Sequence, residues 1–154
     1  MKLVLNKDKM QIEKEQDVVP FRNRVKEYAV KLGMSLVNQT KLITAASELV
    51  RNMLKYAGGG LAIIEVISMG RDSGIRLTFQ DNGPGIDPAY HNRIFEMFQT
   101  LKPRDLVEGS GIGLAVVKRS VESRGGTIGV ESKSEDGATF RFTWPKSTST
   151  RVED

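Results

Sequence analysis

Four short sequence blocks follow one another along this chain, and together they restrict what it can fold into. They are ELVRN at 48–52, DNGPGI at 81–86, IFEMF at 94–98 and GSGIGL at 109–114. The first places a carboxylate and an amide on one helix face, the second an acid at a strand end, and the fourth a glycine-rich turn before a helix. A domain that combines these features has the inventory of a nucleotide site.

Length and composition indicate one globular domain. The 154 residues are 39% hydrophobic and 27% charged, which suits a single core. We expect this domain to span 1–145, followed by a polar, disordered tail at 146–154. Without cysteine, the chain has no disulfide and no thiolate metal site. No apolar run approaches the roughly 20 residues of a membrane helix, so we expect a soluble, cytoplasmic chain that binds no membrane.

The net charge of +4 raises the question of nucleic-acid binding. The Lys and Arg residues are interleaved with Asp and Glu, and no basic stripe with aromatic residues is present. We therefore expect no nucleic-acid partner. A basic surface also suits ATP or an acidic protein partner.

Hydrophobic spacing predicts an α/β two-layer sandwich with a mixed, largely antiparallel sheet and helices on one face. Asp17 should cap the first helix and Gly33 end it, and the second should run from Ser35 or Asn38 to Ala57. A third should run from 112 to 123. Strands are predicted at 2–5, 10–14, 61–68, 75–80, 127–132 and 138–144.

The first block lies on the second predicted helix. Glu48, Asn52 and Lys55 follow one another at i, i+4 and i+7, so they form a polar stripe along one side. Taken alone, such a triplet is more often a solvated flank than a site, but the neighbouring blocks reverse that preference. The amide oxygen of Asn52 is a suitable hard ligand for Mg²⁺, and a carboxylate one turn earlier can orient or deprotonate an attacking group.

The two glycine-rich blocks suit the two ends of a nucleotide. Asp81 ends a strand and can accept a hydrogen bond from an adenine amino group, in a turn whose glycines permit unusual backbone shapes. The second block precedes a helix whose N–H groups and dipole can meet phosphates. It lacks the Lys of a Walker-type loop. The candidate nucleotide-binding residues of the two blocks are Asp81, Gly83, Gly85, Ile86, Gly109, Ser110, Gly111, Ile112, Gly113 and Leu114.

Residues 87–108 form a polar stretch that we interpret as a lid. Lys102 or Arg104 could reach the γ-phosphate, although either one alone is more often a solvated surface residue. The only histidine, His91, has no companion for metal binding and receives no catalytic role.

The four blocks resemble the N, G1, F and G2 boxes of the GHKL ATPases, the superfamily of gyrase, heat-shock chaperone, histidine kinase and mismatch-repair ATPase domains. The resemblance covers roughly residues 10 to 145 and implies the same two-layer fold, with ATP and Mg²⁺ as cofactors. It further implies Asn52 as the Mg²⁺ ligand, Glu48 as a base, Lys55 at phosphate and Asp81 at adenine. GATF at 137–140 is similar to the family's G3 element, which implies Thr139 near the adenine.

The two halves of the chain resemble different branches of this superfamily. The front half is similar to the bacterial switch-protein serine kinases, and the rear half to histidine kinase catalytic domains. The absence of a phosphoacceptor helix and the presence of Glu48 favour a stand-alone serine/threonine kinase that phosphorylates an antagonist switch protein and also binds a second regulator, a sigma factor or a phosphatase.

Two alternatives stay open. One is a histidine kinase domain acting on a partner or on a missing phosphoacceptor domain. The other is an ATP-gated anti-sigma module without essential catalysis. Homodimers occur in the anti-sigma branch, so self-association is a further expectation.

Overall fold

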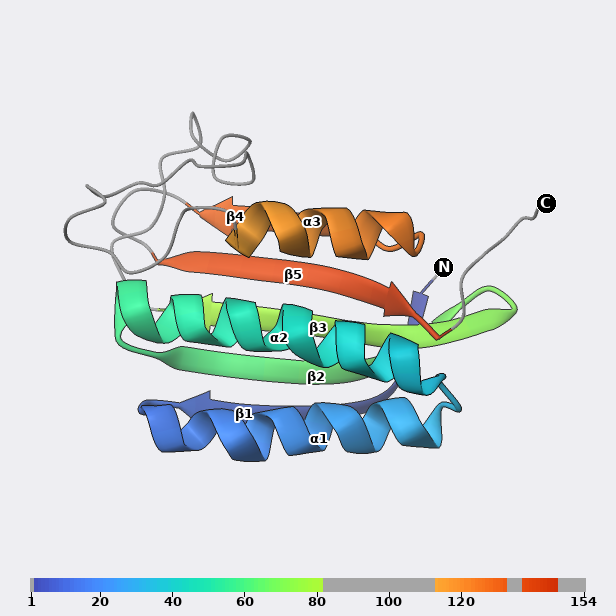
Figure 1. Cartoon of the computed structure of the whole chain (residues 1–154), viewed down its shortest axis with the longest axis horizontal. Coiled ribbons are helices and arrows are strands. Elements are labelled where there is room, and N and C mark those ends of the chain that lie inside the picture. The colour runs from blue at the N-terminus through green and yellow to red at the C-terminus, as the bar shows by residue number, and fades with distance from the viewer. Residues whose placement is uncertain (1, 82–112, 133–136, 147–154) are drawn as a thin grey trace.

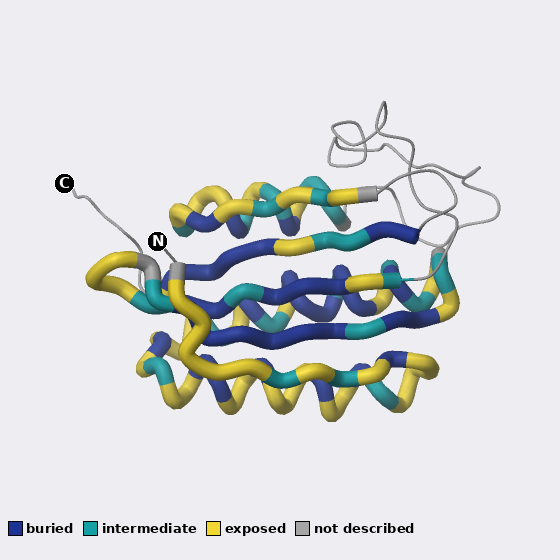
Figure 2. Tube along the Cα trace, turned by 180° about the vertical axis from the view of Figure 1, so that it is seen from behind, coloured by how far each residue is buried: buried dark blue, intermediate teal, exposed yellow. Residues whose placement is uncertain are grey.

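A five-stranded sheet lies against three α-helices in the computed structural model, which describes residues 2–81, 113–132 and 137–146 (Figure 1). The helices cover one face of the sheet, and the view from behind in Figure 2 looks onto the strands. The elements are β1 (Lys2–Ile12), the 3-10 turn η1 (Glu15–Asp17), α1 (Val18–Lys31), α2 (Leu36–Ala57), β2 (Gly60–Met69), β3 (Asp72–Asp81), α3 (Gly113–Ser123), β4 (Ile128–Ser132) and β5 (Ala138–Pro145).

The strand order is β1-β2-β3-β5-β4, and all four neighbouring pairs of described strands are antiparallel. The predicted two-layer fold is confirmed, and so is the hairpin between β2 and β3. The last strand in the sequence, β5, lies inside the sheet between β3 and β4. Strand β3, which precedes residues 82–112, therefore pairs directly with β5, which follows them.

The core lies between the sheet and the helices. Ile75, Leu77 and Phe79 alternate on β3 and are buried, as the pattern predicts. Phe79 stacks on Phe142 with 6.4 Å between ring centroids, and Phe21 of α1 meets Phe79 edge-on at 5.7 Å. Aromatic side chains from α1, β3 and β5 thus unite both halves of the chain.

Helix α2 begins and ends as the sequence predicts. The Ser35 hydroxyl accepts a hydrogen bond from the Asn38 N–H at 3.1 Å, which is an N-cap. At the other end Gly58 adopts a φ of 75°, and its N–H donates to the Leu54 carbonyl. The helix is therefore fixed at both ends by local sequence.

The amino-terminal prediction needs two corrections. Residues 2–5 and 10–14 were expected as separate strands around a turn at Asn6-Lys7-Asp8, but one strand runs through them, with an irregular register between Val4 and Asn6. Pairing with β2 overrides the local turn preference. Asp17 caps the preceding turn instead of α1, because its carboxylate accepts from the N–H groups of Glu13 and Lys14. The Glu13 N–H is the main reason that the pKa of Asp17 is lowered.

Little of the predicted C-terminal tail lies within the described residues. The tail predicted at 146–154 lies outside the described residues except for Lys146, whose N–H donates to the Ser73 carbonyl at 2.9 Å. Among the described helices, none combines the length and apolar character that crossing a membrane requires.

Candidate nucleotide site

Four elements meet at one end of the molecule. Helix α2 and strand β3 both finish there, and helix α3 and strand β5 both start there (Figure 1). This arrangement brings the first block, the start of the second block and the end of the fourth block to the same end. More than 50 residues separate the first block from the fourth in the sequence, so the topology makes them neighbours.

The polar stripe of α2 is present in the structure. Glu48 and Asn52 are half-buried, and Lys55 is exposed near the helix end. Leu49, Val50 and Met53 between them are buried in the core. The stripe therefore lies at the boundary between the core and solvent, where side chains can contact a ligand and keep a fixed helical backbone behind them.

Close packing fixes this helix relative to the end of β3. Gly60 faces Asp81 in the β2–β3 register. A Cβ atom added to Gly60 would come within 2.9 Å of the Met53 sulfur and within 2.8 Å of the Asp81 Cα. Because there is no room for a side chain at position 60, the turn of α2 that carries Asn52 packs close to Asp81.

Asp81 is oriented by the backbone of β5. Its Oδ1 accepts a hydrogen bond from the Ala138 N–H at 3.0 Å, and the residue is half-buried. Sequence reasoning missed Ala138 as a site residue. The alternation of β5 could have found it, since Ala138 shares the face of Phe140, Phe142 and Trp144.

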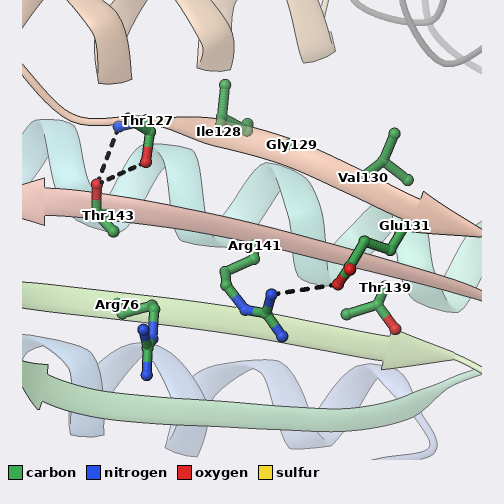
Figure 3. Close-up of a pocket in the computed structure, with 9 residues that line it drawn as sticks. All are labelled: Arg76, Thr127, Ile128, Gly129, Val130, Glu131, Thr139, Arg141 and Thr143. Carbon is green, nitrogen blue, oxygen red and sulfur yellow. Dashed lines mark hydrogen bonds and ion pairs between the residues drawn. The ribbon is translucent and has the colours of Figure 1, made fainter. Parts of the chain in front are cut away.

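Thr139 lies on the other face of the sheet. It pairs with Gln80 and Glu131, and its side chain lines a cavity of about 290 Å³ on the helix-free side (Figure 3). Successive residues of a strand point to opposite faces, so the Thr139 side chain is not brought together with Asp81. The prediction that this hydroxyl touches adenine is not supported by the geometry, and the cavity itself is separate from the candidate nucleotide site.

The described residues contain no group of three His, Asp or Glu side chains that could hold a metal ion. Mg²⁺ fits the site in a different way, since it commonly takes one or two protein oxygens and completes its shell with phosphate and water. The half-buried amide of Asn52 can supply such an oxygen.

Helix α3 brings the end of the glycine-rich block to the site. Gly113 is its first residue, and Leu114 is half-buried and packs against the core. Several predicted residues fall outside the described part of the chain, and the structure does not place them. These are Gly83, Gly85, Ile86, His91, Lys102, Arg104, Gly109, Ser110, Gly111 and Ile112.

Curated relatives match most of this chain at moderate identity. Phytochrome-like protein Cph1 of Synechocystis is 36% identical over 130 residues, covering 81% of this chain and 17% of that protein. Sensor-like histidine kinase SenX3 of Mycobacterium tuberculosis is 38% identical over 112 residues, covering 71% and 27%. Sensor protein KdpD of Escherichia coli is 36% identical over 106 residues, covering 69% and 12%. The chain thus corresponds to less than a third of each of these relatives.

Solved structures share the fold. The mycobacterial sensor histidine kinase MprB matches with a TM-score of 0.57 at 21% identity, over 91% of this chain and 97% of that one. The catalytic domain of histidine kinase ThkA matches with a TM-score of 0.60 at 22% identity, over 94% and 99%. These likenesses support the two-layer architecture and not a particular activity.

The relatives favour one of the two expected branches of the superfamily over the other. SenX3 is a sensor-like histidine kinase and KdpD a sensor protein, so these two relatives favour the histidine kinase alternative over the serine/threonine partner-switching kinase, and they give no support to an anti-sigma factor. A model of the family described as histidine kinase-, DNA gyrase B-, and HSP90-like ATPase matches residues 37–148. The chain therefore belongs to this family of ATPases, the GHKL superfamily.

Proposed function

We propose that this chain is the ATP- and Mg²⁺-dependent catalytic domain of a histidine kinase, which transfers the γ-phosphoryl group of ATP to a histidine of a phosphoacceptor domain. That domain would lie elsewhere in a longer chain or in a partner. The observation that supports the proposal most directly is Asp81, held by the Ala138 N–H at the end of the molecule where α2 ends and α3 begins. The kinship to sensor kinases supports the choice of acceptor.

Each site residue has a role that its chemistry suits. The Asp81 carboxylate accepts a hydrogen bond from the adenine amino group, and the Ala138 N–H fixes its orientation. Asn52 holds Mg²⁺, which neutralises phosphate charge when bound. Lys55 adds positive charge near the phosphates, and the first turn of α3 presents backbone N–H groups. Catalysis comes mainly from positioning and charge neutralisation.

A serine or threonine acceptor is the second candidate because of Glu48. This half-buried carboxylate lies one helical turn before Asn52, where it can take the proton of an attacking hydroxyl. A neutral imidazole attacks through a lone pair and needs no such deprotonation. Glu48→Gln should therefore abolish transfer to a hydroxyl and reduce transfer to histidine far less.

The partners that follow from the main proposal are a phosphoacceptor domain and a response regulator that receives the phosphoryl group. Dimerisation would then come from the phosphoacceptor domain.

Nucleotide binding is tested by titrating Mg²⁺-ATP into the chain in a calorimeter. Asp81→Asn should weaken ATP binding by about tenfold or more. The amide replaces one acceptor oxygen by an NH2 donor, which cannot accept a hydrogen bond from the adenine amino group. Asp72→Asn is the matched control, since Asp72 is an exposed acid at the opposite end of the same strand. Equal affinities of Asp81→Asn and Asp72→Asn for ATP would contradict the proposed contact between Asp81 and adenine.

The acceptor is identified by incubating the chain with γ-labelled ATP, Mg²⁺ and a lysate of its source organism, followed by acid and base treatment of the labelled protein. Label that is lost in acid and kept in base supports histidine transfer. Acid-stable label establishes serine or threonine transfer instead. ATP binding without label on any protein contradicts both and favours a regulatory binding module.

A further inference from the structure

The sheet has a second face that the nucleotide site does not use, with exposed charged side chains on β1, β5 and β4 and buried residues such as Ile63 and Thr78 in its middle. Within the described residues, no helix covers the face that carries Lys7, Lys9, Glu65, Arg76, Arg141 and Glu131, here called the open face (Figure 2). These residues lie on one side because cross-strand partners point the same way and successive residues alternate. Asp72 lies on the same face, two residues before Gly74 on β3, so four cationic and three acidic side chains give these seven positions a net charge of +1.

The cavity of about 290 Å³ lies on this face, between β3, β5 and β4 (Figure 3). Arg141 projects over it, opposite Gly129 on β4. A Cβ atom added to Gly129 would meet nothing within 4 Å, so the space beside the guanidinium is open. The hydroxyls of Thr127 and Thr143, 3.1 Å apart, add further hydrogen-bonding groups to its wall. This set of groups suits a carboxylate.

The two arginines of the cavity differ in how firmly they are held. Arg76 makes two hydrogen bonds to Glu65, at 2.9 and 3.3 Å, and the Glu65 side chain is only 9% exposed. Arg141 pairs with Glu131 at 3.2 Å and donates a long hydrogen bond of 3.4 Å to the Thr78 hydroxyl, and the Glu131 side chain is 76% exposed. An exposed ion pair contributes little stability, so a carboxylate from outside can replace Glu131 at low cost. Arg141 is therefore the arginine of the cavity whose acidic partner an external carboxylate can replace.

Lys9 and Arg141 are too far apart for one small anion to contact both. Lys9, Ile63, Thr78 and Arg141 follow one another across β1, β2, β3 and β5 in register. Three strand spacings of about 4.8 Å separate the backbones of Lys9 and Arg141 by about 14 Å. An extended polypeptide covers that distance with about four or five residues.

From these observations we infer that the open face binds an acidic, extended polypeptide segment of a partner protein, with one of its carboxylates replacing Glu131 on Arg141. This interaction surface is separate from the nucleotide site and does not depend on the proposed phosphotransfer.

The test uses a fluorescein-labelled peptide of about ten alternating Glu and Ser residues, with binding to the intact chain followed by fluorescence anisotropy at low salt. Arg141→Gln should weaken binding by about fivefold or more, and Arg141→Lys should recover part of it. Glu131→Gln should strengthen binding by about twofold to fivefold, because it removes the competing carboxylate.

A matched pair of controls comes from α1. Arg24 and Glu27 form an exposed ion pair at 2.9 Å, with Arg24 46% exposed against 45% for Arg141. Arg24→Gln and Glu27→Gln change the net charge by the same amounts as the open-face variants. They should leave peptide affinity within about twofold, and thermal unfolding verifies that every variant is folded.

Three outcomes would overturn the inference. One is equal weakening by Arg141→Gln and Arg24→Gln, which would show that only net charge matters. Another is unchanged or weaker binding by Glu131→Gln. The third is tighter binding of a single-stranded RNA of equal charge with the same dependence on Arg141, which would assign the open face to nucleic acid.

Discussion

Single residues tie distant parts of this fold together, and Asn38 is the clearest case. The residue is 1% exposed, and its side chain uses both ends of the amide. Oδ1 accepts from the Trp144 indole N–H, and Nδ2 donates to the Lys146 carbonyl at 3.0 Å. Asn38 thereby connects the first turn of α2 to the end of β5, and each buried polar group in the connection has a partner.

Asn38→Ala should destabilise the domain by about 2–4 kcal/mol, because it leaves a buried indole N–H and a carbonyl without their partner. The neighbouring variant Gln39→Ala removes one hydrogen bond from a half-buried side chain to the Met34 carbonyl and should cost about 1 kcal/mol. Urea unfolding of both variants measures the difference. Similar losses would show that the Trp144 contact contributes nothing special.

A buried phenol gives the domain a stability limit at high pH. Burial, followed by the hydrogen bond at 2.6 Å to Asp8, raises the pKa of Tyr28 from 10.0 to about 12. The neutral form is thus favoured in the fold, and its contribution is present below pH 10 and lost as the pH rises through about 12. The free energy of unfolding of the native chain should fall more steeply over this range than that of Tyr28→Phe, as denaturant midpoints at each pH would reveal.

At the level of elements, Gly60 lies where β2, β3 and α2 pack closely together beside the site. Gly60→Ala would bring a Cβ within 2.2 Å of the Gln80 carbonyl oxygen, so the backbone must move. We expect a loss of about 1–3 kcal/mol and weaker nucleotide binding, because Asp81 would be displaced. Gly129→Ala, with open space around its Cβ, is the control and should be neutral or slightly stabilising. Thermal unfolding and ATP titration distinguish the two.

Most elements could be predicted from the sequence, because their patterns were strong and local. The caps of α2 and the alternation of β3 and β5 needed no tertiary information. Strand β1 was predicted as two pieces, since its polar middle is typical of a turn and only the pairing with β2 keeps it extended. Asp17 was assigned to the wrong turn because both helical segments begin within three residues of it.

At the scale of the whole molecule, ligand binding should appear as stability. A ligand at about one hundred times its dissociation constant adds about 2.7 kcal/mol to the free energy of unfolding. Mg²⁺-ATP should therefore raise the melting temperature, and ATP without Mg²⁺ should raise it less. Asn52→Ala should lose the Mg²⁺-dependent part and keep the remainder, whereas Thr44→Ala on the exposed side of α2 should behave like the native chain. A scan with and without chelator measures both parts.

The candidate site was only partly predictable. The spacing of Glu48, Asn52 and Lys55 follows from helical geometry, and the structure shows that stripe. The pairing between β3 and β5 decides on which face of the sheet each β5 side chain lies. It places Ala138, and not Thr139, on the same face as Asp81. The acceptor depends on a partner surface that no motif in this chain encodes. The serine/threonine prediction therefore rested on Glu48, on the absence of a phosphoacceptor helix and on the resemblance of the front half, none of which identifies the acceptor.

The position of β5 inside the sheet has a consequence for synthesis on the ribosome. A nascent chain that ends before Ala138 already contains α1, α2 and the β1-β2-β3 sheet, but β3 is then an edge strand. Asp81 lacks its backbone donor, and Trp144 has not yet reached Asn38. The domain should therefore acquire nucleotide affinity only after its final strand has left the exit tunnel.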